Sequence, residues 1–93
     1  MDWERVLDMR RRGVSLYTEE RKSFRIALVS GRILTVDDFK GNRYDVTVSN
    51  LEKAEDLLRK GVVISGPEEY RLKVADEHST FAWAILRELG DLG

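Results

Sequence analysis

The chain has 93 residues, of which 42% are hydrophobic and 35% are charged, and its net charge is −1. This length predicts a single domain over residues 1–93 that buries roughly 65% of the surface of its unfolded chain. The near-zero net charge excludes a protein whose overall charge drives it onto DNA or an anionic membrane, and the absence of cysteine excludes disulfides, zinc sites with cysteine ligands and thiol nucleophiles.

The first half of the chain predicts one helix followed by three strands. A helix is expected over residues 2–12, with Asp2 as its N-terminal cap and Gly13 ending it in a left-handed conformation. After a connector at residues 14–22, apolar and polar residues alternate as they do in strands with one apolar face. The strands are expected at residues 24–29, 33–36 and 43–48, with Ser30-Gly31 as a tight turn and with Phe24, Ile26 and Leu28 on one face of the first strand.

The second half predicts two helices with two strands between them. Ser49 and Glu52 have the spacing of a capping box, which would open a helix that runs through Lys60. Short apolar and alternating segments predict strands at residues 62–64 and 70–74. Asp76 is expected to cap a last helix over residues 77–89.

The expected element order is therefore α-β-β-β-α-β-β-α. Short connections between consecutive strands indicate hairpins, so the sheet is expected to be largely antiparallel. Strands with one apolar face need cover on that face alone. We predict an α+β fold of two layers, in which three helices cover one face of a five-stranded sheet.

The sequence contains no motif that is typical of catalysis or of cofactor binding. Its one histidine, His78, stands beside two acids at the start of a predicted helix, which is not a metal-binding spacing. No glycine-rich phosphate loop is present. The apolar runs are far shorter than the roughly 20 residues of a membrane span, and the first residues contain no apolar signal core. We expect a cytoplasmic protein without catalytic residues, cofactor, metal or membrane partner.

A tryptophan in the last predicted helix lies outside the apolar stripe of that helix. At about 100° per residue, Trp83 falls about 200° from Phe81, beyond the stripe. Ser79 and Arg87 share its side, and Trp and Arg are frequent hot spots of interfaces. We therefore predict a non-enzymatic protein-interaction module, a homodimer or the subunit of a complex, that uses Trp83, Arg87 and Ser79. Cover of the indole by another helix of the same chain, with Arg87 stacked on it, is the alternative for Trp83.

Basic residues are concentrated in the first half of the chain. Residues 1–50 hold ten Lys and Arg against eight acids, whereas residues 51–93 hold six against nine. A basic patch could contact phosphates, so weak nucleic-acid binding is the alternative function. The candidate residues are Arg10, Arg11, Arg12, Arg21, Lys22, Arg25, Arg32, Lys40 and Arg43. A small ligand bound between helices and sheet is a third hypothesis.

The composition also predicts heat resistance. Gln and Cys are absent, and Glu, Lys and Arg are abundant, which is typical of proteins from thermophiles. We expect one cooperative unfolding transition with a midpoint above the mesophile range of about 45–65 °C, measured by differential scanning calorimetry. A midpoint inside that range would contradict the thermophile interpretation, and separate transitions would contradict the single domain.

Overall fold

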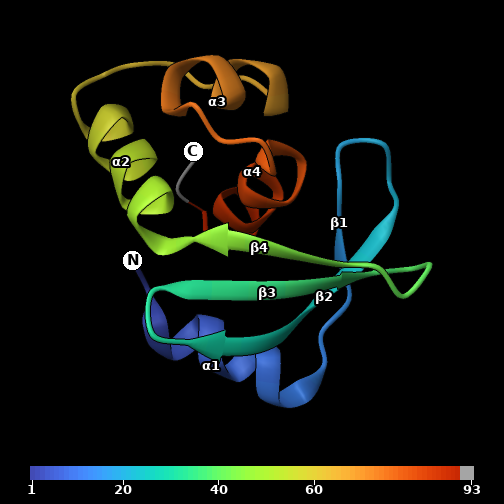
Figure 1. Cartoon of the computed structure of the whole chain (residues 1–93). Helices are drawn as coiled ribbons and strands as arrows, with labels where there is room; N and C mark the ends of the chain where they lie inside the picture. Colours follow the sequence, from blue (N-terminus) through green and yellow to red (C-terminus); the bar gives the residue numbers. More distant parts are fainter. Residues whose placement is uncertain (91–93) are drawn as a thin grey trace.

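The computed structural model describes residues 1–90, which form four helices and a four-stranded antiparallel sheet (Figure 1). The α+β class and the antiparallel sheet are confirmed, but the prediction of five strands and three helices is wrong. In chain order the elements are α1 (Trp3–Arg12), β1 (Leu16–Tyr17), β2 (Ser23–Ser30), β3 (Ile33–Asp38), β4 (Arg43–Thr47), α2 (Val48–Arg59), α3 (Pro67–Val74) and α4 (Ser79–Glu88).

The sheet is a meander in which the strands lie side by side in chain order, β1-β2-β3-β4. Each neighbouring pair is antiparallel. Ser30 pairs with Ile33, so the turn between β2 and β3 contains two residues, Gly31 and Arg32. Gly31 has a φ of 56°, and positive φ at this position is what the favoured two-residue hairpin turns require. The expected hairpin is therefore present.

A bulge at Ala27 reverses the two faces of β2 halfway along the strand. Ile26 pairs with Val36, but Leu28 pairs with Thr35, so Ala27 is an extra residue in the ladder. Leu28 is 42% exposed. The expectation that Leu28 lies on the apolar face of this strand is wrong, because the extra residue turns its side chain toward solvent.

Residues 70–74 belong to a helix and not to a strand. Pro67 stands in the first turn of α3, and the first turn is acidic, as is common at helix starts. Tyr70 and Val74, four residues apart, are buried, whereas Leu72 between them is 67% exposed. Over five residues this apolar pattern is compatible with the two-residue period of a strand and with the 3.6-residue period of a helix. The proline and the acids at the start favour the helix.

Two further differences concern short segments. Residues 62–64 lead from α2 to α3 without entering the sheet, and Val63 is 68% exposed, so the strand expected there is wrong. β1 consists of Leu16 and Tyr17, which pair with the start of β2 inside the expected connector. Two residues are too few to show a strand period in the sequence.

Both ends of α1 are capped as expected, but the expected N-terminal cap of α2 is absent. The carboxylate of Asp2 accepts a hydrogen bond from the Arg5 amide at 3.1 Å, and Gly13 ends α1 with a φ of 62°. α2 begins one residue before Ser49, after Thr47, and no side chain caps it. The expected capping box is wrong, because the glutamate that would complete it forms an ion pair with the β2–β3 turn instead.

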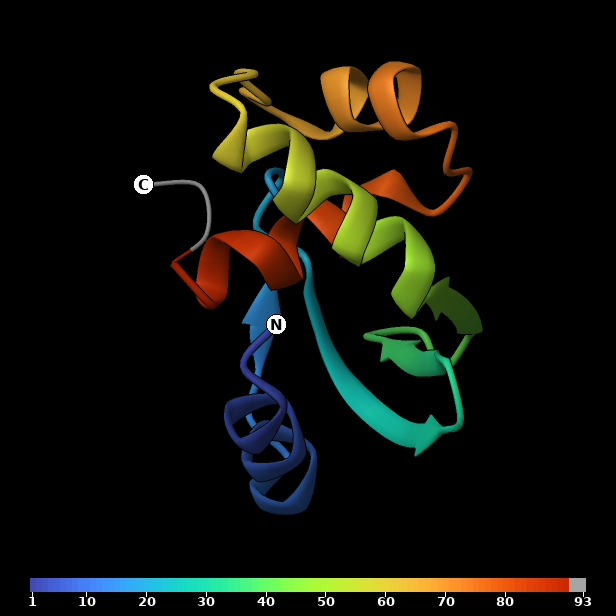
Figure 2. The same ribbon diagram turned by 90° about the vertical axis from the view of Figure 1, so that its left-hand side faces the viewer.

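One face of the sheet is apolar and contributes to the core. Leu34, Val36 and Val46 are fully buried, whereas Arg25 and Arg43 on the opposite face are exposed. In Figure 2, α1 and α4 lie on the same side of the strands, with α2 above them and α3 at the top. α3 packs on α4 and α2. The predicted two-layer arrangement is thus extended by a helix that covers other helices.

Tyr70 offers a test of the core. Tyr70 is fully buried, and its hydroxyl has no hydrogen-bond partner among the described residues 1–90. Burial raises the pKa of this hydroxyl, so it stays protonated. We predict that Tyr70→Phe leaves the free energy of unfolding unchanged or raises it by about 1–2 kcal/mol, because an unpaired buried hydroxyl costs about 1–3 kcal/mol. Urea denaturation measures this change.

The matched control is Leu34→Ala, which leaves a cavity in the same core. It should lower the free energy of unfolding by about 2–5 kcal/mol. A loss above about 1 kcal/mol in Tyr70→Phe would contradict an unpaired hydroxyl, since it would reveal a hydrogen bond worth about that much.

Candidate functional site

Residues of the same chain cover Trp83. This residue is 8% exposed, and its indole nitrogen donates a hydrogen bond to the carbonyl oxygen of Ile64 at 3.4 Å. The Arg87 guanidinium lies 4.8 Å from the centroid of the indole ring and donates to the carbonyl oxygen of Tyr17 at 2.5 Å. Ser79 is 6% exposed. The indole therefore needs no partner chain for its cover, which removes the physical reason for an interface centred on Trp83.

The position of α4 explains this cover. α4 lies between the sheet and α3, so it buries residues on two opposite sides. Residues 81–86 read Phe-Ala-Trp-Ala-Ile-Leu, and such an uninterrupted apolar run is typical of a helix that is buried all round. A helical wheel with one apolar stripe does not describe such a helix, and the uninterrupted apolar run at residues 81–86 is the sequence signal for burial on more than one side.

Three residues of the predicted basic set form ion pairs with neighbouring acids. Arg11 and Arg12 lie 2.9 Å and 2.8 Å from the two carboxylate oxygens of Asp8, on the same helix. Arg32 forms an ion pair with Glu52 at the far end of the β2–β3 hairpin. Two carboxylates therefore face these three arginines, so one positive charge is not balanced within the pairs.

Five of the other six basic residues line one of two hollows. Lys22 and Lys40 line a cavity of about 410 Å³. Arg21 lines neither hollow, and its backbone is left-handed with a φ of 65°. A smaller hollow of about 200 Å³ lies between the end of α1 and the strands β2, β3 and β4. We call it the arginine hollow; its residues are Arg10, Gly13, Arg25, Ile26, Ala27, Asp37 and Arg43.

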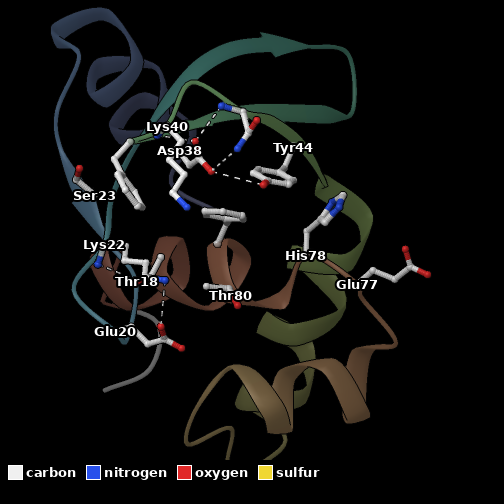
Figure 3. A pocket seen from close by; sticks show the side chains of 13 residues that line it. Thr18, Glu20, Lys22, Ser23, Asp38, Lys40, Tyr44, Glu77, His78 and Thr80 are labelled. Atoms are coloured by element: carbon white, nitrogen blue, oxygen red, sulfur yellow. Dashed lines mark hydrogen bonds and ion pairs between the residues drawn. The ribbon is translucent and has the colours of Figure 1, made fainter.

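The larger cavity, which we call the aromatic pocket, lies where three separate segments meet (Figure 3). These segments are the β1–β2 loop, the β3–β4 turn and the start of α4. Lys40 and Tyr44 point into it from the β3–β4 side, whereas Glu77 points away from it. Its residues are Thr18, Glu20, Lys22, Ser23, Asp38, Phe39, Lys40, Asn42, Tyr44, Glu77, His78, Thr80 and Phe81.

Stacked rings form the floor of the aromatic pocket. The rings of Tyr44 and Phe81 are stacked, with centroids 4.9 Å apart and an angle of 24° between the planes. Phe24 meets Phe81 edge-on at 5.1 Å, and His78 meets Tyr44 edge-on at 5.5 Å. Phe39 at the rim is 56% exposed. The pocket therefore offers an aromatic floor and one free aromatic ring.

Asp38 holds the β3–β4 turn in shape. One of its carboxylate oxygens accepts hydrogen bonds from the backbone amides of Lys40 at 2.9 Å and Asn42 at 2.8 Å. The other lies 3.5 Å from the Tyr44 hydroxyl. Partial desolvation alone would raise the pKa of Asp38, but the hydrogen bonds from Asn42, Lys40 and Tyr44 outweigh it and hold that pKa below its usual value. The carboxylate is thus an anchor of the turn.

Thr18 holds the β1–β2 loop in a similar way. Thr18 is 3% exposed, and its hydroxyl oxygen accepts a hydrogen bond from the backbone amide of Lys22 at 3.1 Å. Its own amide donates to the carbonyl oxygen of Lys22 at 3.0 Å. The Lys22 ammonium lies 3.5 Å from a carboxylate oxygen of Glu20, and both side chains are largely exposed. This loop therefore presents a loosely paired cation to the pocket.

The start of α4 fixes His78. α4 begins at Ser79 and not at Glu77, and Asp76 accepts a hydrogen bond from the His78 amide at 2.8 Å instead of capping the helix directly. Nδ1 of His78 lies 2.6 Å from the carbonyl oxygen of Asp45. Because a carbonyl oxygen accepts, Nδ1 is the nitrogen that carries the proton. This bond orients the ring as a wall of the pocket.

Among residues 1–90 no group of three His, Cys, Asp or Glu side chains could hold a metal ion. In the same part of the chain no helix is long and apolar enough to cross a membrane.

Comparison of the chain with protein-family models, with curated proteins and with solved structures gives no match in any of the three. The site must therefore be interpreted from its own geometry.

Truncation of Trp83 tests which surface covers it. Since the chain itself buries the indole, we predict that Trp83→Ala lowers the free energy of unfolding by about 3–5 kcal/mol. The mass in solution should stay that of the wild type. Denaturant titration and light scattering measure the two quantities. Leu72→Ala is the control, because Leu72 is 67% exposed and its truncation should change neither. Reduced mass at unchanged stability would instead restore an interface at Trp83.

Proposed function

We propose that the chain is a non-enzymatic module that binds a nucleotide unit of nucleic acid in the aromatic pocket. The observation that carries this proposal is the union of stacked aromatic rings and lysines around one cavity of about 410 Å³. A nucleotide combines a planar base with an anionic phosphate, and these are the two features that such a lining complements.

Stacking would provide most of the binding energy. Base–aromatic stacking is worth about 1–3 kcal/mol per base, and every base has a flat face that can stack. Phe39 is exposed at the rim, and the Lys40 ammonium lies 5.6 Å from the centroid of its ring. A base that stacks on Phe39 would therefore bring its phosphate close to a cation.

The pocket lining holds two lysines against three acids, so its total charge does not by itself favour a phosphate, and the available cation is Lys40. Asp38 is engaged in the turn, and Glu77 points away from the cavity (Figure 3). Glu20 lies next to the Lys22 ammonium. Lys40 forms no ion pair with any residue in the described range 1–90, so its charge is available. The net charge of −1 keeps the expected binding weak and sensitive to salt.

A binding role agrees with the state of the polar groups in the pocket. Asp38 and Thr18 hold loops, and His78 donates to a backbone carbonyl oxygen. Each of these groups thus has a structural role, because its hydrogen bond holds a loop or orients a ring.

A second candidate function is self-association at the edge of the sheet. β1 is an edge strand, and Tyr17 on it is 53% exposed beside Arg87. Tyrosine and arginine are both frequent hot spots of interfaces. A wild-type protein that is monomeric by light scattering would contradict this candidate.

Titration with thymidine monophosphate tests the nucleotide proposal. We expect measurable binding by isothermal titration calorimetry at low salt, with thymidine and inorganic phosphate each binding more weakly because each lacks one of the two features. Phe39→Ala should weaken the affinity at least about fivefold, since it removes a stacking ring. Lys40→Gln should also weaken it and should reduce its dependence on salt.

Matched controls separate these effects from general loss of surface groups. Leu72→Ala removes an apolar side chain that is exposed like Phe39, and Lys53→Gln removes a lysine on the outside of α2. Neither should change the affinity. Equal binding by wild type and Phe39→Ala, or no binding by wild type at low salt, would sink the proposal.

A further inference from the structure

The aromatic pocket continues into the arginine hollow through a third depression. This depression holds about 310 Å³ and shares Ser23, Asp38 and Phe39 with the aromatic pocket. It also shares Arg25 and Asp37 with the arginine hollow. The three hollows are therefore adjacent and form one path, which runs from the start of α4 past Phe39 to the end of α1.

The far end of this path carries an excess of positive charge. Asp37 lies between two arginines, 2.8 Å from Arg43 and 4.0 Å from Arg25. The side chain of Asp37 is 14% exposed, whereas those of Arg25 and Arg43 are 64% and 65% exposed. Arg10 is a third arginine here, and it forms no ion pair with any residue in the described range 1–90. The hollow thus brings together three arginines and one carboxylate.

The arginines keep donors free for a further anion. The Nε atom of Arg43 lies 2.8 Å from Asp37, but that carboxylate oxygen makes no aligned hydrogen bond within residues 1–90. Arg25 is at the limit of an ion-pair distance. A guanidinium has five N–H donors in a fork that matches two oxygens of a phosphate. The hollow is therefore suited to a phosphate group.

We infer that the path binds a single strand of nucleic acid, with one base in the aromatic pocket and a neighbouring phosphate in the arginine hollow. This inference rests on the proposed function, because it extends the nucleotide site to a strand. The strand must be unpaired at this point, since a base held between Phe39 and the pocket floor is not available to a complementary strand.

Affinity as a function of strand length tests the inference. A mononucleotide, a dinucleotide and a hexanucleotide of thymidine are titrated by isothermal titration calorimetry at several salt concentrations. The hexanucleotide should bind at least about tenfold more tightly than the mononucleotide, because it adds phosphate contacts. A duplex of the same length should bind more weakly than the single strand.

Substitutions at the arginines locate the added contacts. Arg10→Gln and Arg43→Gln should weaken hexanucleotide binding and should each reduce the slope of log affinity against log salt by about 0.7, the value for one phosphate contact on a single strand. Neither should change binding of the mononucleotide. Arg10→Gln removes no ion pair, so it stays informative if Arg43→Gln disturbs Asp37. Arg59→Gln on α2 is the control and should change neither quantity.

The outcomes distinguish the inference from the proposed function. Equal affinity for mononucleotide and hexanucleotide would overturn the strand path and leave the nucleotide pocket intact. An unchanged salt slope in both arginine variants would overturn the path as well, as would a duplex that binds as tightly as the single strand. Failure of every thymidine ligand to bind would overturn both.

Discussion

The stacked rings of Tyr44 and Phe81 are the contact on which the pocket and its surroundings depend. Tyr44 comes from β4 and Phe81 from α4, and Phe24 of β2 meets Phe81 edge-on. This contact fixes the sheet against the central helix and at the same time forms the floor of the pocket. Aromatic pairs of this kind add about 0.5–1.5 kcal/mol beyond the burial of their area. A contact at the edge of the core therefore also lines the pocket.

The loops around that floor are held in shape by their own hydrogen bonds. Asp38 binds the amides of its turn, and Thr18 binds the amide and the carbonyl oxygen of Lys22. Loops that are ordered before a ligand arrives lose less conformational entropy on binding. Phe39 and the two lysines thus stand on ordered backbone, while their side chains remain exposed.

Local signals in the sequence were sufficient for some elements and insufficient for others. Asp2 and the β2–β3 turn were predicted because capping and turn chemistry act within a few residues. The bulge at Ala27 has no such signal, and the cover of Trp83 depends on a connector about twenty residues earlier in the chain. Most of the site was not predictable, since its residues come from three separate segments. Phe39 in particular stands in a polar loop, where nothing in the sequence indicates its partners.

The central claim is that a base enters the aromatic pocket, and photochemical cross-linking tests it most directly. The protein is irradiated with a single strand that carries a photoreactive thymidine analogue, and the cross-linked peptide is identified by mass spectrometry. The account predicts that the adduct forms within residues 39–44 or at Phe81, and that unlabelled strand competes for it. An adduct on α2 or α3, or one that an excess of unlabelled strand does not reduce, would contradict the account.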